Sequence, residues 1–314
     1  MTTVSGLSAG GYMAAQYQVA FAGEVKGIGL FAAGPWNCAR GSRQLALQDC
    51  ANASTSAPPV PLLLETLRAL AATGAVAPTA LLADDRVWIF RGTRDSRVVA
   101  PVTDALVKFY RALLMPAQIT TVFAVPAGHG LPTLANAPSV ACGDSAAPYL
   151  NACAYDGAGE MLQAITARNG GELDTPPTPQ TDSTGPATGR LLHFDQRPYD
   201  PTGQLGPTGY LYVPELCRAA AAHCQLHIAF HGCQQGSDAI GQTFVRAAGY
   251  NRWAATYHLV VLYPQVAPSR ALPFNPLGCW DWWGYTGANY TSRSAPQLAA
   301  VHAMVEALAL TPER

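Results

Sequence analysis

Hydrophobic positions along the chain form two kinds of segment, strand-like apolar runs and helix-compatible stretches, which alternate along much of the sequence. Continuous apolar runs without a helical stripe are typical of strands buried on both faces, and they cover residues 25–33, 86–91, 118–125, 225–230 and 259–263. Segments compatible with a helix lie between or beside these runs, at 11–22, 61–73, 101–114, 155–169 and 296–310. This alternation predicts an α/β fold, with a mostly parallel central sheet and helices on both faces.

Four other stretches differ from this alternation. Residues 191–194 and 208–213 have the composition of two antiparallel strands. Residues 172–189 are rich in Pro, Thr and Gly and lack apolar periodicity, so we expect a loop or linker there. Residues 39–60 predict an irregular segment, and the helix at 61–73 could belong to the core or to a lid.

Length and composition restrict the classes of function. A chain of 314 residues with 49% hydrophobic residues can form one large domain or two small ones. The formal net charge of -1, with 12% charged residues, offers no electrostatic footprint for nucleic acid or an anionic membrane. No apolar run approaches the length of a membrane span. The N-terminus lacks a signal-peptide pattern, so we expect that any export signal has been removed or was never part of this chain.

The strongest chemical signal is the pentapeptide Gly6-Leu7-Ser8-Ala9-Gly10. A strand-like run precedes it and a helix-compatible stretch follows it. This is the context of a nucleophile elbow, in which flanking glycines allow a sharp strand-to-helix turn that exposes the serine. A small-residue turn that matches the pattern by chance is the alternative. The context favours Ser8 as a nucleophile.

Two further strand ends supply the partners that such a serine needs. Asp95 follows the strand at 86–91, and His129 follows the strand at 118–125. The order serine, acid, histidine along the chain is that of α/β-hydrolases and differs from those of chymotrypsin and subtilisin. Five other histidines lie inside strand-like or helical stretches, so a structural role is the better interpretation for them. They are His193, His223, His227, His258 and His302. The remaining histidine, His231, belongs to a separate motif.

That separate motif, His231-Gly232-Cys233, follows the strand at 225–230. In α/β-hydrolases a loop of this type supplies an oxyanion N–H, but it normally precedes the nucleophile in sequence. Joining the C-terminus to Met1 would restore the usual order, with 172–189 as a bridge between the ordinary termini. The sequence therefore predicts a circularly permuted α/β-hydrolase fold, and we expect residues 1–314 to form a single catalytic domain.

Eight cysteines form an even set without zinc-type Cys-x-x-Cys spacing. Neighbours in sequence would pair Cys38 with Cys50, Cys142 with Cys153 and Cys217 with Cys224, but spacing alone leaves 105 connectivities open. Disulfides of this kind indicate an oxidising compartment, so we expect a secreted, extracellular or periplasmic protein. Buried free thiols in a cytosolic enzyme are the alternative.

Five segments carry a combined pattern, at 4–13, 151–159, 209–214, 226–233 and 278–282. Together with all eight cysteines, they resemble the single-domain, circularly permuted extracellular polyhydroxybutyrate depolymerases. The resemblance extends over nearly the whole chain. The chain differs from the family in a longer bridge and over residues 57–80.

The resemblance implies hydrolysis of short-chain polyhydroxyalkanoate esters through an acyl-enzyme. The implied triad is Ser8, Asp95 and His129, and the implied oxyanion donors are the backbone N–H groups of Ala9 and Cys233. The implied substrate-contacting residue is Trp282. The implied disulfides are the three neighbour pairs and a fourth between Cys233 and Cys279.

The fourth disulfide would connect the oxyanion loop to the aromatic segment 280–283, which we expect to form a wall for the substrate. Trp280 and Trp282 are therefore predicted to bind substrate, although at least one tryptophan of this segment is expected to fill the core. The predicted partner is a polyester or oligoester of 3-hydroxybutyrate, and we expect a monomer. No metal, nucleotide or other cofactor motif is present in the sequence.

Two alternatives remain at this stage. One is a feruloyl-type, acetyl xylan-type or general carboxylesterase, because secreted α/β-hydrolases share these parts. The other is a catalytically silent binding protein on a hydrolase scaffold, which the Ser8, Asp95 and His129 set disfavours.

Overall fold

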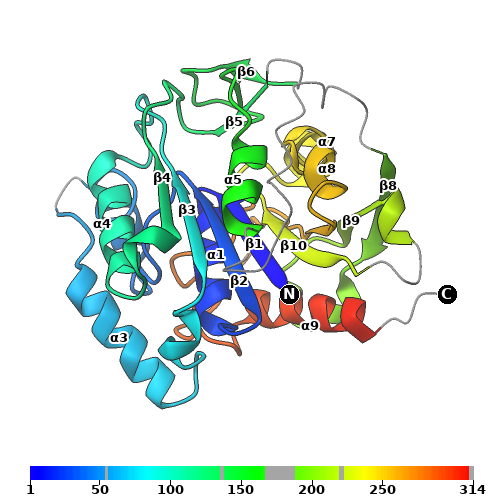
Figure 1. Ribbon diagram of the computed structural model, residues 1–314. Helices are drawn as coiled ribbons and strands as arrows, with labels where there is room; N and C mark the ends of the chain where they lie inside the picture. The colour runs from blue at the N-terminus through cyan, green and yellow to red at the C-terminus, as the bar shows by residue number, and fades with distance from the viewer. Residues whose placement is uncertain (54–55, 135–137, 167–187, 219–222, 311–314) are drawn as a thin grey trace.

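An eight-stranded sheet runs through the centre of the computed structural model (Figure 1). The structure describes residues 1–53, 56–134, 138–166, 188–218 and 223–310. The strands of this sheet are β1 (Thr2–Leu7), β2 (Val25–Phe31), β3 (Arg86–Phe90), β4 (Ile119–Val122), β8 (Gly189–Asp195), β9 (Thr208–Pro214), β10 (Gln225–Phe230) and β11 (Leu259–Tyr263). Their order across the sheet is β4-β3-β2-β1-β10-β11-β9-β8.

Strand direction follows the sequence pattern. The strands of the five apolar runs (β2, β3, β4, β10 and β11) and β1 pair in parallel with one another. Strand β9 is antiparallel to both β8 and β11. Central parallel strands are covered on both faces, which explains why they lack a polar side. The α/β class, with a mostly parallel sheet, is confirmed.

Helices cover both faces of the sheet. Alternate residues of the strands, such as Ile28 and Ile89, pack against α1 (Ala9–Ala20), α3 (Val60–Ala72), α4 (Ala100–Arg111) and α9 (Pro296–Leu310). The intervening residues, such as Trp88 and Tyr263, pack against α5 (Gly157–Thr166), α7 (Thr243–Ala247) and α8 (Tyr250–Ala254). Among the residues that the structure describes, no helix has both the length and the apolar character required to cross a lipid bilayer.

The first strand of the chain lies in the interior of the sheet. Strand β1 pairs with β2 on one side and, in parallel, with β10 on the other, so that Gly6 lies opposite Phe230. When the strands are counted from β8 through β11 and then from β1 to β4, β1 becomes the fifth strand and β10 the third. The elbow then follows the fifth strand and the His-Gly loop the third, as the permuted fold requires.

The bridge predicted at 172–189 lies outside the described residues except for its last two positions. Strands from before and after it share one sheet.

Several short elements have no counterpart in the sequence prediction. They include the helices α2 (Arg43–Gln48), α6 (Ser237–Ile240), α7 and α8, and a small sheet of β5 (Leu131–Thr133), β6 (Val140–Ala141) and β7 (Leu150–Ala152). Helix α2 replaces part of the irregular segment expected at 39–60; its first turn is capped by Ser42 Oγ, which accepts the Leu45 N–H at 3.3 Å. Elements this short depend on tertiary contacts and carry little periodicity of their own.

Candidate active site

Ser8 occupies the sharp turn between β1 and α1. Its backbone has φ 56° and ψ -120°, a region that non-glycine residues rarely adopt and that costs about 1–3 kcal/mol. A Cβ on Gly6 would lie 2.2 Å from the Gly10 carbonyl oxygen, and a Cβ on Gly10 would lie 2.3 Å from the Phe230 oxygen. Both glycines are therefore required by close backbone approach, and the half-buried serine is presented at the end of the strand.

Asp95 and His129 meet where β3 and β4 end. Asp95 Oδ2 lies 2.9 Å from His129 Nδ1, and both side chains are almost completely buried. The other carboxylate oxygen accepts the backbone N–H groups of Arg97 at 2.8 Å and Val98 at 3.0 Å. With the carboxylate held on Nδ1, the imidazole presents Nε2 on its opposite edge.

The loop that carries His129 is held by two hydrogen-bonding side chains and one disulfide. Ser145 Oγ accepts the His129 backbone N–H at 2.8 Å. The buried Asn151 amide donates to the carbonyls of Cys142 at 2.8 Å and Asp144 at 2.7 Å. The disulfide between Cys142 and Cys153 closes the same loop. These contacts fix the position of the imidazole. The disulfide was expected from the sequence, whereas the roles of Ser145 and Asn151 were not predicted.

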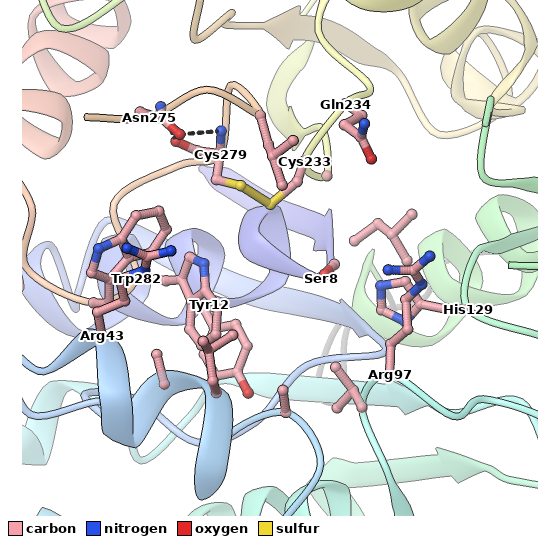
Figure 2. A pocket seen from close by; sticks show the side chains of 18 of the residues that line it. Ser8, Tyr12, Arg43, Arg97, His129, Cys233, Gln234, Asn275, Cys279 and Trp282 are labelled. Carbon is pink, nitrogen blue, oxygen red and sulfur yellow. Dashed lines mark hydrogen bonds between the residues drawn. A yellow bond between two sulfur atoms is a disulfide. The ribbon is translucent and has the colours of Figure 1, made fainter. Parts of the chain in front are cut away.

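Ser8 and His129 line one cavity of about 280 Å³ (Figure 2). In the described part of the chain, the Ser8 hydroxyl and the His129 imidazole form no hydrogen bond with each other. A contact of this kind commonly tightens only when substrate binds.

The predicted oxyanion donors come from two loops that lie together. Ala9 is the first residue of α1, so its N–H has no acceptor within the helix. Cys233 lies just beyond β10, which pairs with the strand that leads into Ser8, and it lines the same cavity. The structure therefore places the start of the chain beside the loop around residue 232.

Two buried side chains fix the orientation of the Cys233 amide. His231 Nε2 accepts the Val266 N–H at 3.1 Å, and Nδ1 lies 2.7 Å from the Gly232 carbonyl oxygen. Burial lowers the pKa of His231 to about 4, so the neutral ring donates from Nδ1 to that carbonyl. The carbonyl and the Cys233 N–H belong to one trans peptide and point in opposite directions. The contact from His231 thus turns the Cys233 N–H away from the core.

Gln235 and a disulfide complete this support. Gln235 Oε1 accepts the Gly232 N–H at 2.7 Å, and its amide donates to the Pro148 carbonyl at 2.8 Å. Cys233 is bonded to Cys279. The other three disulfides also join the pairs that the resemblance implied: Cys38 with Cys50, Cys142 with Cys153 and Cys217 with Cys224.

The cavity wall is mainly apolar and aromatic. Trp282 lines it and stacks on Tyr12, with ring centroids 4.7 Å apart and planes inclined by 18°. Trp283, Tyr149 and Leu277 contribute further apolar surface. Asp281 Oδ1 and Oδ2 accept backbone N–H groups at 2.7 Å from Gly284 and 2.8 Å from Thr286, so a buried carboxylate shapes the tryptophan segment.

Trp280 is a correction to the sequence prediction. Its side chain is fully buried and packs edge-on against Phe230, with ring centroids 5.0 Å apart. It does not line the cavity, so it cannot contact substrate there. Along this segment the chain turns so that Trp280 enters the core while Trp282 faces the cavity. The sequence alone does not show which of these closely spaced tryptophans is buried.

The sequence analysis also missed several cavity residues, namely Tyr12, Arg43, Leu47, Arg97, Tyr149, Gln234 and Phe274. Only Tyr12 and Arg97 had a usable signal, because each lies a few residues after a predicted catalytic residue. Arg43 and Leu47 lie on the short helix α2, and the rest come from loops; the positions of both depend on tertiary contacts.

Comparisons with known proteins agree with this geometry. No family model matches the chain. The chain is 39% identical to a poly(3-hydroxybutyrate) depolymerase of Delftia acidovorans over 97% of its own length, and it spans 59% of that longer protein. It is 34% identical to a polyhydroxybutyrate depolymerase of Talaromyces funiculosus, covering 97% of this chain and 88% of the relative.

A solved structure is similar over the same extent. It is a serine-to-alanine variant of a PHB depolymerase complexed with an R3HB trimer, and it matches with a TM-score of 0.85 and 32% identity, covering 97% of this chain and 94% of that one. The identity and coverage show that the chain belongs to the polyhydroxybutyrate depolymerase family of serine ester hydrolases.

Proposed function

We propose that this chain is a secreted serine esterase that hydrolyses the ester bonds of poly(3-hydroxybutyrate) and its oligomers. The observation that carries the proposal is the arrangement on one cavity: Ser8 on a strained elbow, His129 backed by Asp95, and the Cys233 amide beside them. The R3HB trimer in the similar structure supports 3-hydroxybutyrate units as the substrate class.

The proposed acylation uses each of these parts. His129 Nε2 takes the proton of the Ser8 hydroxyl as Oγ attacks the ester carbonyl carbon. Negative charge develops on the carbonyl oxygen, where the N–H groups of Ala9 and Cys233 would stabilise it. When the intermediate collapses, the ester C–O bond breaks, and the imidazolium returns the proton to the departing alcohol.

Deacylation repeats the sequence with water. His129 removes a proton from a water molecule, which attacks the acyl-enzyme, and the proton then passes to Ser8 Oγ as the acid leaves. Asp95 holds the imidazole in the tautomer that both halves need and stabilises its charged form.

The cavity wall supports a polyester substrate. Trp282, Trp283 and Leu277 offer apolar surface that can pack against the methyl and methylene groups of the substrate. We further propose that residues 1–314 act as a single catalytic domain and as a monomer outside the cytoplasm. Strands from both sides of 172–189 in one sheet support the first point, and four disulfides support the last.

Product analysis tests the proposal. The chain should release 3-hydroxybutyrate and short oligomers from a poly(3-hydroxybutyrate) film and from the soluble trimer, detected by mass spectrometry, while the Ser8→Ala variant releases none. Hydrolysis of feruloyl or acetyl xylan esters without hydrolysis of the trimer would contradict the assigned substrate class.

A further inference from the structure

Two arginines line the cavity on opposite sides of Ser8, and this feature is not used by the proposed mechanism. Figure 2 shows Arg97 beside His129 and Arg43 beside Trp282, with Ser8 between them. None of the described residues that line the cavity is an aspartate or glutamate. An apolar cavity with guanidinium groups and no carboxylate attracts anionic ligands.

Arg97 is held near the imidazole by several contacts. Its backbone N–H donates to Asp95 Oδ1 at 2.8 Å. Its guanidinium lies 5.9 Å from the centre of the Tyr149 ring, and that ring packs edge-on against His129. The one acceptor that the described residues offer the guanidinium is the Ser145 carbonyl, at 3.3 Å. Since a guanidinium has five N–H donors, most remain available to a ligand at this exposed position.

The two ends of a 3-hydroxybutyrate oligomer differ chemically, and each end binds on a different side of Ser8. In the proposed hydrolysis, the departing alcohol receives its proton from His129, so the leaving group lies on the side of the imidazole. In an oligomer of 3-hydroxybutyrate, the alcohol product of every ester cleavage contains the carboxyl end of the chain. The acyl part contains the hydroxyl end. A free carboxylate therefore reaches the Arg97 side, and the Arg43 side faces an uncharged end.

We propose that Arg97 forms a carboxylate subsite on the leaving-group side of the cavity. Through this subsite the enzyme selects free-acid oligomers and cleaves units next to their carboxyl end. The reaction remains ester hydrolysis, in which water is consumed and an acid and a hydroxy acid are formed. The inference rests on the proposed function and adds to it a preference for substrates that end in a carboxylate.

The test compares the 3-hydroxybutyrate trimer as its free acid and as its methyl ester. At low ionic strength the wild-type kcat/KM should favour the free acid by about tenfold, equivalent to about 1.4 kcal/mol. Arg97→Met should bring the ratio close to one, mainly by raising KM for the acid, because the carboxylate does not react and is bound equally in ground and transition states. Added salt should reduce the wild-type preference.

Two matched variants serve as controls. Arg94 is an exposed arginine of the same loop whose side chain packs against Gly143 and does not line the cavity, so Arg94→Met should keep the preference. Arg43→Met should keep it too. A second readout is inhibition by 3-hydroxybutyrate during hydrolysis of p-nitrophenyl butyrate, which Arg97→Met should weaken.

The outcomes separate this inference from the proposed function. Hydrolysis of both trimers with a ratio unaffected by Arg97→Met would overturn the subsite. A ratio that falls in Arg43→Met and persists in Arg97→Met would also overturn it, because the carboxylate would lie on the acyl side. Failure to hydrolyse either trimer would overturn the proposed function, and this inference with it.

Discussion

Two serine–histidine pairs arise from strand β1 and the turn that ends it, and they differ in almost everything except residue type. Ser5 Oγ lies 2.9 Å from His227 Nε2 and donates to Tyr250 Oη at 2.9 Å. Thr3 Oγ1 lies 2.8 Å from His227 Nδ1. All four side chains are buried. Ser8, in contrast, lines a cavity with His129 and has no direct hydrogen bond to it in the described part of the chain.

The two pairs differ in the direction of the serine proton, in the group behind the imidazole and in access to a cavity. Because the Ser5 proton is donated to Tyr250, Ser5 Oγ accepts from His227 Nε2–H, so this imidazole has no free lone pair toward the serine. Burial lowers the pKa of His227 to about 3, and the described residues place no carboxylate in hydrogen-bond contact with its ring, whose partners are Thr3 and Ser5. His129 has Asp95 at 2.9 Å, an accessible cavity and adjacent backbone donors. A short serine–histidine distance alone would select the wrong pair.

Replacing each serine is the strongest way to separate the pairs. Ser8→Ala should lower kcat on a soluble oligomer ester by about 10⁶-fold, because the nucleophile is removed. Ser5→Ala should retain turnover and instead lower the free energy of unfolding by about 1–2 kcal/mol, because buried partners lose a hydrogen bond. Steady-state kinetics and urea unfolding of both variants measure this. Loss of turnover in a folded Ser5→Ala variant would break the comparison.

The carboxylate behind His129 gives the next largest effect. Asp95→Asn should reduce kcat by about 10⁴-fold, since an amide on Nδ1 favours the wrong imidazole tautomer and cannot stabilise the imidazolium. The same kinetic assay measures it, with circular dichroism as the check on folding. Activity within a few-fold of wild type would show that the Asp95 contact has no catalytic part.

The buried pair of Ser5 and His227 should affect the free energy of unfolding and its dependence on pH, instead of turnover. The folded pKa of His227, lowered from 6.5 to about 3, means that the unfolded chain binds more protons below pH 6.5. Stability is therefore complete above that pH and decreases as pH falls, by about 2–3 kcal/mol near pH 4.5. His227→Gln lacks this titration, so its stability should change less between pH 7 and 4.5.

Urea unfolding at both pH values tests this, with the wild type as the reference. His231 shifts in the same direction and Asp85, with a pKa raised to about 6 by burial, in the opposite one. Both residues are present in both proteins, so their contributions cancel. Equal acid sensitivity of the two proteins would contradict the assignment.

The oxyanion loop should give the smallest effect. Replacing Cys233 and Cys279 together by serine releases this loop from the tryptophan segment but keeps the Cys233-position amide under the control of His231 and Gln235. A decrease in kcat of about tenfold is expected, below the loss seen when a donor is removed outright. An unchanged kcat would show that the disulfide does not position the amide.

Much of the fold was predictable because its signals are local and repeated. Apolar runs such as residues 25–33 and 259–263 are typical of buried strands. The permutation was predicted because the His231-Gly232-Cys233 loop follows the elbow in sequence instead of preceding it. The small sheet β5–β7 and helix α2 were not predictable, since their few residues depend on disulfides and loop contacts formed elsewhere.

The candidate site divides in the same way. Ser8, Asp95 and His129 each follow a recognisable strand, so position along the chain located them. The residues that hold them in place, such as Ser145, which accepts the His129 backbone N–H, are distant in sequence and belong to no motif. The prediction for Trp280 was wrong because the sequence does not show which tryptophan of residues 280–283 packs in the core.

Covalent labelling can identify the nucleophile by direct observation. The protein should be treated with a serine-directed fluorophosphonate near neutral pH, digested and analysed by mass spectrometry, in parallel with Ser8→Ala. One adduct on Ser8, absent from the variant and accompanied by loss of ester hydrolysis, is the predicted result. An adduct on Ser5, or full inactivation with Ser8 unmodified, would contradict the account.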